Sequence, residues 1–119
     1  MIDLRLGDCL EILKDIPDKS IDAVITDPPY YRVADAKWDK QWKTKEEYIN
    51  WLECAAKEWR RILKDNGSLY VFSDDKMAAY VQVMLDNYFL LVNNLVWFKV
   101  NNLPIKNTYH LRSFAPMTE

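Results

Sequence analysis

The stretch Ile21-Asp-Ala-Val-Ile-Thr-Asp-Pro-Pro-Tyr30 decides the fold. Residues 21–26 are almost entirely apolar over the length of one strand, which predicts a strand buried on both faces, as in a parallel sheet. The two prolines that follow cannot donate ladder hydrogen bonds, so the strand is expected to end at this turn. A polar turn after a buried strand lies at the carboxyl edge of the sheet, where ligands bind in open α/β folds.

The segments around this stretch alternate between strand-like and helix-like patterns. Further strands are predicted at residues 2–6, 68–73 and 89–98. The last of these is either continuous or interrupted at 93–94. Another apolar stretch covers residues 111–118. Helices are predicted after Asp8, after Thr44 up to a stop at Gly67, and over 77–88. Strand–helix–strand alternation implies parallel pairing through right-handed crossovers. We therefore predict an α/β fold, with a mainly parallel sheet flanked by helices, in one domain over residues 1–119.

The composition excludes several classes of protein. The 119 residues are 50% hydrophobic with a formal net charge of -2, which excludes wholesale disorder and a generally basic nucleic-acid coat. Two glycines exclude a P-loop and a GxGxxG turn. The two cysteines are far apart, which gives no zinc pattern and argues against a disulfide framework. Without a signal-like leader or an apolar run of about 20 residues, we expect a reduced, cytoplasmic protein.

Basic side chains gather in one part of the sequence. Residues 31–64 carry nine basic and six acidic side chains, whereas residues 1–30 carry three and seven. Two interpretations stay open: local fluctuation on a solvated surface, or a positive segment that faces a polyanion. Residues 31–43 have no clear period and predict a long loop, and long loops often carry function.

The turn from Asp27 to Tyr30 has the chemistry to bind an amine on a flat ring. The ionised carboxylate of Asp27 and the carbonyl of Pro28 both accept hydrogen bonds, and an NH2 group offers two donors. Tyr30 adds a ring on which a base could stack, worth about 1–3 kcal/mol. The alternative is a proline turn with an Asx contact and a buried tyrosine. The position after a buried strand favours the binding site.

Residues 21–30 resemble the catalytic motif of the DNA amino-methyltransferases, which methylate adenine N6 or cytosine N4. The resemblance extends over essentially the whole chain through segments in the family's order, at 6–13, 61–72, 96–104 and 112–119. This order resembles the permuted β group, in which the catalytic half precedes the target-recognition region and a glycine-containing cofactor loop. Neither is found in these 119 residues. The resemblance thus implies the catalytic half of a Rossmann-like, S-adenosylmethionine-dependent methyltransferase.

The resemblance also implies roles for individual residues. The catalytic motif consists of Asp27, Pro28, Pro29 and Tyr30. Asp27 and the Pro28 carbonyl would bind the target amine, while Tyr30 would stack on a base flipped out of duplex DNA. The cofactor S-adenosylmethionine would lie against Asp8, Cys9 and Asp27, with Asp8 near its adenine portion. Asp8 fits a plain helix N-cap as well, and both roles can hold together.

Several loop residues would face DNA if the resemblance holds. They are Tyr31, Arg32, Trp38 and Lys40 on the long loop, and Lys99, Asn101 and Asn102 after the last predicted strand. The alternative for the last three is an ordinary solvated loop. A lone histidine, His110, gives no reason to expect a metal site or a general base, and it is assigned no role.

The implied activity is methyl transfer from S-adenosylmethionine to the exocyclic amine of a flipped base in double-stranded DNA. Asp27 as the first motif residue, in place of serine, favours adenine N6 over cytosine N4. The competing interpretation is a non-catalytic remnant that keeps the fold without the cofactor loop, and the isolated chain is expected to be inactive. A sheet cut short exposes apolar surface, so we expect self-association or a further C-terminal half as partner. The gene would be bacterial, archaeal or phage-encoded.

Overall fold

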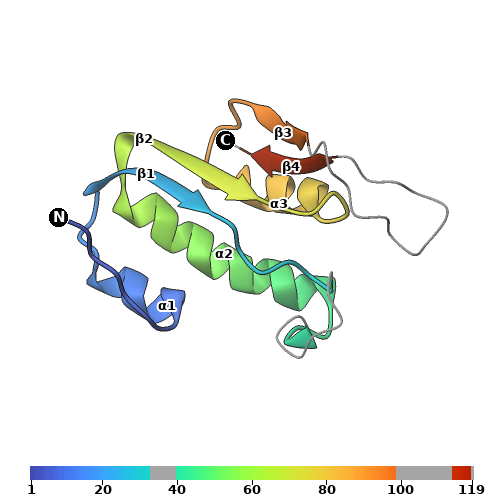
Figure 1. Ribbon diagram of the computed structural model, residues 1–119, viewed down its shortest axis with the longest axis horizontal. Coiled ribbons are helices and arrows are strands. Elements are labelled where there is room, and N and C mark those ends of the chain that lie inside the picture. Colours follow the sequence, from blue (N-terminus) through green and yellow to red (C-terminus); the bar gives the residue numbers. More distant parts are fainter. Residues whose placement is uncertain (33–39, 99–113, 119) are drawn as a thin grey trace.

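The computed structural model describes residues 1–32, 40–98 and 114–118, which form one sheet with helices packed against it (Figure 1). The sheet of the described residues has four strands in the order β1-β2-β4-β3. The strands are β1 (Ile21–Thr26), β2 (Leu63–Phe72), β3 (Asn94–Phe98) and β4 (Phe114–Thr118). The helices are α1 (Cys9–Ile12), its 3-10 continuation η1 (Leu13–Asp15), α2 (Lys45–Ile62) and α3 (Ala78–Leu85). None of the described helices is long and apolar enough to cross a membrane.

Three of these strands run in one direction. β1 pairs with β2 in parallel, with Thr26 opposite Val71, and β4 runs antiparallel to both β2 and β3. β3 therefore points the same way as β1 and β2. The predicted α/β class and mainly parallel sheet are confirmed. The reversed β4 was not predicted, because an apolar stretch at 111–118 carries no information on strand direction.

The long helix α2 forms as the capping and periodicity predict. The Thr44 side chain accepts a hydrogen bond from the Glu47 amide at 3.1 Å, and the Glu47 carboxylate accepts from the Lys43 amide at 2.7 Å. These contacts satisfy amides that a helix start leaves without partners. Its buried side chains are Tyr48, Leu52, Ala55, Ala56, Trp59 and Ile62. All of these except Ile62 share one core with Leu69 and Val71 of β2 and with the buried side of α3.

The predicted strand at residues 2–6 is wrong. These residues join no ladder, and Ile2, Leu4 and Leu6 are all exposed. An alternating pattern indicates which side chains are apolar, but a strand also needs a neighbour that accepts its backbone hydrogen bonds. The edge strands of the described sheet are β1 and β3, and the 2–6 segment pairs with neither of them.

Two predicted boundaries also differ from the structure. The helix expected to stop at Gly67 ends at Ile62, because Leu63 already pairs with Ile21 and the register shifts before Ser68 pairs with Ala23. Gly67 allows the two strands to approach closely at this irregular point of the ladder. An added Cβ would lie 2.9 Å from a Leu63 methyl and 3.0 Å from the Asp22 carbonyl oxygen. The strand expected over 89–98 begins only at Asn94, after backbone hydrogen bonds to the Leu85 carbonyl close the end of α3.

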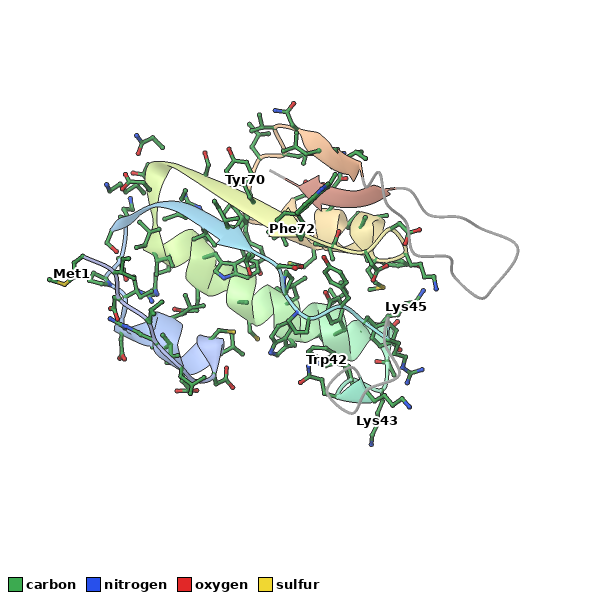
Figure 2. All side chains as sticks on the ribbon, in the orientation of Figure 1. Met1, Trp42, Lys43, Lys45, Tyr70 and Phe72 are labelled. Atoms are coloured by element: carbon green, nitrogen blue, oxygen red, sulfur yellow. The ribbon has the colours of Figure 1, made fainter. Side chains whose placement is uncertain are left out.

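Among the described residues, helices cover one face of the sheet and leave the other face open. Leu69 and Val71 point into the core beneath α2 and α3, whereas Figure 2 shows Tyr70 and Phe72 on the side of β2 away from α2. On that side Ile25 is 72% exposed and Trp97 58% exposed, and the Phe72 and Trp97 rings lie 5.9 Å apart. We call the surface formed by Ile25, Tyr70, Phe72 and Trp97 the open face.

Candidate active site at the carboxyl edge of β1 and β2

The turn from Asp27 to Tyr30 follows β1 directly and lies beside the end of β2. Because β1 and β2 are parallel and Thr26 pairs with Val71, both strands end at the same edge of the sheet. Asp27 is exposed, Pro28 is buried, and Pro29 and Tyr30 are half-buried. The buried proline fixes the turn while the Asp27 carboxylate remains accessible to a ligand.

Tyr30 is kept in its neutral form by its surroundings. Burial raises the pKa of its hydroxyl, and so do hydrogen bonding to Asp27 and the negative charges of Asp27 and Asp74. All these effects disfavour the phenolate. Tyr30 therefore offers an uncharged, partly exposed ring next to an exposed carboxylate, which suits a flat heterocycle that carries an amine.

A second carboxylate, that of Asp74, is buried just after β2. Its Oδ1 accepts hydrogen bonds from the amides of Lys76 at 2.7 Å and Met77 at 3.1 Å, and its carbonyl accepts from the Ala78 amide at 2.9 Å. These contacts start α3. Burial raises the pKa of Tyr48, and the charge of Asp74 raises it further.

The sequence reasoning missed Ser73 and Asp74 as residues of this edge. Ser73 is buried, and within the described part of the chain its hydroxyl has no hydrogen-bond partner. The signal that singled out Asp27 applies to both, since they too follow a strand of a parallel pair. The sequence pattern at 68–73 predicts a strand, and the same rule applied to its end points to Ser73 and Asp74.

Tyr31 and Arg32 lie at the base of the long loop and contact other parts of the protein. The Tyr31 hydroxyl donates to the Lys43 carbonyl at 3.2 Å, and the Arg32 guanidinium donates to the same oxygen at 2.6 Å. The guanidinium carbon of Arg32 also lies 5.2 Å from the centre of the Tyr31 ring. Both side chains therefore contact the residue that leads into α2.

A cluster of rings supports this region. We call it the aromatic cluster, and its members are Tyr31, Trp42, Tyr48 and Trp51. Ring centres are 5.9 Å apart for Tyr31 and Tyr48, 5.0 Å for Trp42 and Tyr48, and 4.9 Å for Trp42 and Trp51. Figure 2 shows Trp42 beside the first turns of α2. Such tilted and edge-to-face pairs hold rings in defined orientations, so the cluster anchors both ends of the loop.

Asp8 acts as a helix cap in the structure. Its Oδ1 accepts from the Leu10 amide at 2.9 Å, and its carbonyl accepts from the Ile12 amide at 3.0 Å, which confirms the N-cap interpretation. Desolvation and then the neighbouring charge of Asp8 raise the pKa of the Cys9 thiol. Within the described residues no hydrogen bond or ion pair joins Asp8 or Cys9 to the Asp27 turn, so their cofactor role stays a prediction.

Of the remaining predicted site residues, the structure describes only Lys40. Lys40 is exposed and lies close to the aromatic cluster in sequence. Trp38, Lys99, Asn101, Asn102 and His110 lie outside the described residues. Among the residues that the structure does describe, no group of three acidic, histidine or cysteine side chains could hold a metal ion.

A cavity of about 300 Å³ lies away from this edge. It is lined by residues from the start of β2, the ends of α2 and α3, and the segment 86–92. Its lining includes Arg60, Leu63, Leu85 and Phe89, but no residue of the Asp27 turn. The chemistry described above therefore belongs to the exposed carboxyl edge and not to this cavity.

Comparison with known proteins identifies the family. Residues 21–119 match the DNA methylase family of the N6-adenine/N4-cytosine type. The chain therefore belongs to this family of DNA methyltransferases.

Relatives and solved structures agree with this assignment. The chain is 35% identical to the type II methyltransferase M.HinfI of Haemophilus influenzae, over 82% of this chain and 32% of that protein. It is 31% identical to the DNA adenine methyltransferase YhdJ of Escherichia coli, over 76% of this chain and 31% of that protein. The chain thus spans about a third of these relatives.

The fold is shared with known methyltransferase structures. The cytosine-N4-specific PvuII DNA methyltransferase matches 95% of this chain with a TM-score of 0.75 and 24% identity, and 46% of its own chain is covered. The complex of M1.HpyAVI with SAM matches 99% of this chain with a TM-score of 0.67 and 25% identity, and 53% of its own chain is covered. The predicted methyltransferase fold is thereby confirmed.

Proposed function

We propose that residues 1–119 form the catalytic half of a DNA methyltransferase domain that methylates the exocyclic amine of a flipped base in duplex DNA. The observation that carries this proposal is the exposed Asp27 carboxylate beside the neutral, half-buried Tyr30, at the carboxyl edge of two parallel strands. The target-recognition region and a glycine-containing cofactor loop would lie outside this segment. The activity belongs to the complete enzyme, acting in the cytoplasm.

Each residue of the turn has a separate role in binding the base. One Asp27 oxygen and the Pro28 carbonyl accept the two N–H groups of the amine, which directs the nitrogen lone pair toward the incoming methyl group. Pro29 keeps the turn rigid, so these acceptors need no rearrangement when the base arrives. Tyr30 stacks on the base. This stacking offsets part of the free-energy cost of extruding the base from the duplex.

S-adenosylmethionine fits the described residues in part. When bound, it supplies an electrophilic methyl group. Asp8 uses Oδ1 to cap α1, and as an exposed residue it can offer its second oxygen to a ligand, with Cys9 next to it. Asp27 would complete this side of the pocket. The solved complex of the relative M1.HpyAVI with SAM supports the choice of cofactor.

We propose adenine N6 as the acceptor, with cytosine N4 as the alternative. Asp27 in the first motif position supports adenine, and so does the similarity to YhdJ, which is described as an adenine methyltransferase. The fold does not decide the question, because the PvuII enzyme shares it and is described as cytosine-N4-specific. Lys40 on the long loop, with Trp38, Lys99 and Asn101, is proposed to contact the DNA.

A chimaeric enzyme tests this function. Residues 1–119 would replace the aligned segment of M.HinfI, and transfer of tritiated methyl groups to duplex DNA would be measured, followed by identification of the methylated nucleoside. We expect activity with N6-methyladenine as the product. N4-methylcytosine would overturn the choice of base, and an inactive but folded chimaera would contradict the catalytic assignment.

A further inference from the structure

Arg32 has a backbone conformation that arginine rarely adopts, two residues after Tyr30. Its φ is +53°, in the left-handed region, where a side chain with a Cβ is strained. Such strain persists only where the surroundings impose it, and it concentrates at functional sites. Lys19 shares this feature with a φ of +49°, but it lies in the turn that leads into β1, at the opposite end of that strand from Asp27.

The strained backbone of Arg32 directs its side chain back onto the protein. The guanidinium lies 5.2 Å from the Tyr31 ring centre, and it shares the Lys43 carbonyl with the Tyr31 hydroxyl, at 2.6 and 3.2 Å. We call this arrangement, made by Tyr31, Arg32 and the Lys43 carbonyl, the clasp. It connects the chain after Tyr30 to a point eleven residues beyond Arg32.

The clasp is attached to rigid parts of the structure. The amide of Lys43 donates to Glu47 at 2.7 Å, which fixes Lys43 to the first turn of α2. The Tyr31 ring packs 5.9 Å from that of Tyr48, which is 1% exposed. The turn is therefore held from one side by the buried Pro28 and from the other by the clasp, with Tyr30 between them.

We infer that Tyr31 and Arg32 are positioning residues that hold the Tyr30 ring in the orientation needed to receive a base. This inference rests on the proposed function for the meaning of that orientation. Direct contact of Arg32 with a DNA phosphate is the competing account. The geometry favours positioning, because the Arg32 guanidinium, although exposed, already donates to a backbone carbonyl and lies over an aromatic ring of the same chain, and it does so from a strained backbone.

The first experiment measures amide hydrogen exchange in the 119-residue chain. Arg32→Gly removes the guanidinium and at the same time removes the backbone strain, whereas Lys19→Gly relieves a similar strain outside the clasp. We expect exchange at the hydrogen-bonded amides of Lys43 and Glu47, which lie next to the clasp, to rise at least about tenfold in Arg32→Gly, which corresponds to about 1.4 kcal/mol of lost local stability. Lys19→Gly should leave these amides unchanged. Unaltered exchange in Arg32→Gly would overturn the clasp.

The second experiment separates positioning from DNA binding in the chimaera. Positioning predicts that Arg32→Gly lowers kcat by about ten- to a hundredfold, since small displacements of reacting groups are costly. The KM for DNA should stay within about twofold, and Tyr31→Phe, which loses only the hydroxyl contact, should show a smaller effect of the same kind. A raised KM with unchanged kcat would overturn the inference in favour of a phosphate contact. If the unaltered chimaera is inactive, the proposed function fails, and amide exchange still decides whether the clasp holds the turn.

Discussion

At the scale of single residues, the site combines one exposed acceptor with one neutral ring. Asp27 and Tyr30 were predicted from the sequence, because a carboxylate and an aromatic residue around two prolines follow a buried strand. The contacts of Tyr31 and Arg32 could not be predicted in the same way. They depend on the Lys43 carbonyl, which only the fold brings to this place.

Substitutions at Tyr30 distinguish stacking from chemistry at the hydroxyl. Tyr30→Ala removes the ring and should lower methyl transfer by about tenfold or more, in line with the loss of about 1–3 kcal/mol of stacking. Tyr30→Phe and Tyr30→Trp keep a flat surface and should retain part of the activity. Tritium transfer by the chimaera measures the series. A phenylalanine variant as inactive as the alanine variant would mean that the hydroxyl is essential.

The raised pKa values of Tyr30 and Tyr48 predict how stability depends on pH. Burial is the first cause for both, so each hydroxyl ionises more easily in the unfolded chain than in the folded one. The contribution of the two neutral hydroxyls to the free energy of unfolding is fully present below about pH 10, the ordinary pKa of tyrosine. It is lost as the pH rises above that value. Urea unfolding at pH 8 to 11 should show a steeper loss for the natural chain than for a variant with Tyr30→Phe and Tyr48→Phe. Parallel curves would contradict these shifts.

At the scale of elements, local signals predicted what local interactions determine. The capping residues Thr44 and Glu47 and the apolar stripe fixed the start and the buried face of α2. The strand at 2–6 failed because pairing is a long-range property, and the direction of β4 is set by its neighbours β2 and β3. The irregular start of β2 around Gly67 likewise depends on its close approach to β1.

The buried face of α2 is predicted to contribute most of the packing energy of the core. Leu52 is fully buried, so Leu52→Ala should lower the free energy of unfolding by about 2–5 kcal/mol. Asn50→Ala, at an exposed position of the same helix, should change it by less than about 0.5 kcal/mol. Chemical denaturation compares the two variants. A loss below about 1 kcal/mol for Leu52→Ala would show that this face is not the core of the folded chain in solution.

At the scale of the whole molecule, the open face is an exposed apolar surface on one side of the described sheet. The helices that the structure describes cover the opposite face, and the chain spans about half of the solved methyltransferase structures that it matches. Exposed apolar area of this kind marks an interaction surface or a cause of aggregation. The sequence predicted such a surface in general terms, but which side chains form it follows from the strand register.

The isolated chain is predicted to associate with itself through the open face. Light scattering of the 119-residue chain should show a dimer or a larger species at high concentration. Ile25→Lys places a charge on the open face and should shift the distribution toward monomer, whereas Val83→Lys changes an equally exposed position on α3 and should not. A natural chain that remains monomeric at high concentration, or equal effects of the two lysines, would contradict this role of the open face.

The central claim is that Asp27 binds the target amine, and one pair of variants tests it most directly. Asp27→Ala in the chimaera should lower the rate of tritiated methyl transfer to duplex DNA by at least about a hundredfold, the usual cost of losing one preorganised polar contact to a reacting group. Asp22→Ala removes another exposed carboxylate of the same chain, which pairs with Lys64 at 2.6 Å, and should leave the rate unchanged. Folding and binding of S-adenosylmethionine, measured by calorimetry, should change much less than the rate does in Asp27→Ala. Full activity in Asp27→Ala, or an equal loss in both variants, would contradict the account.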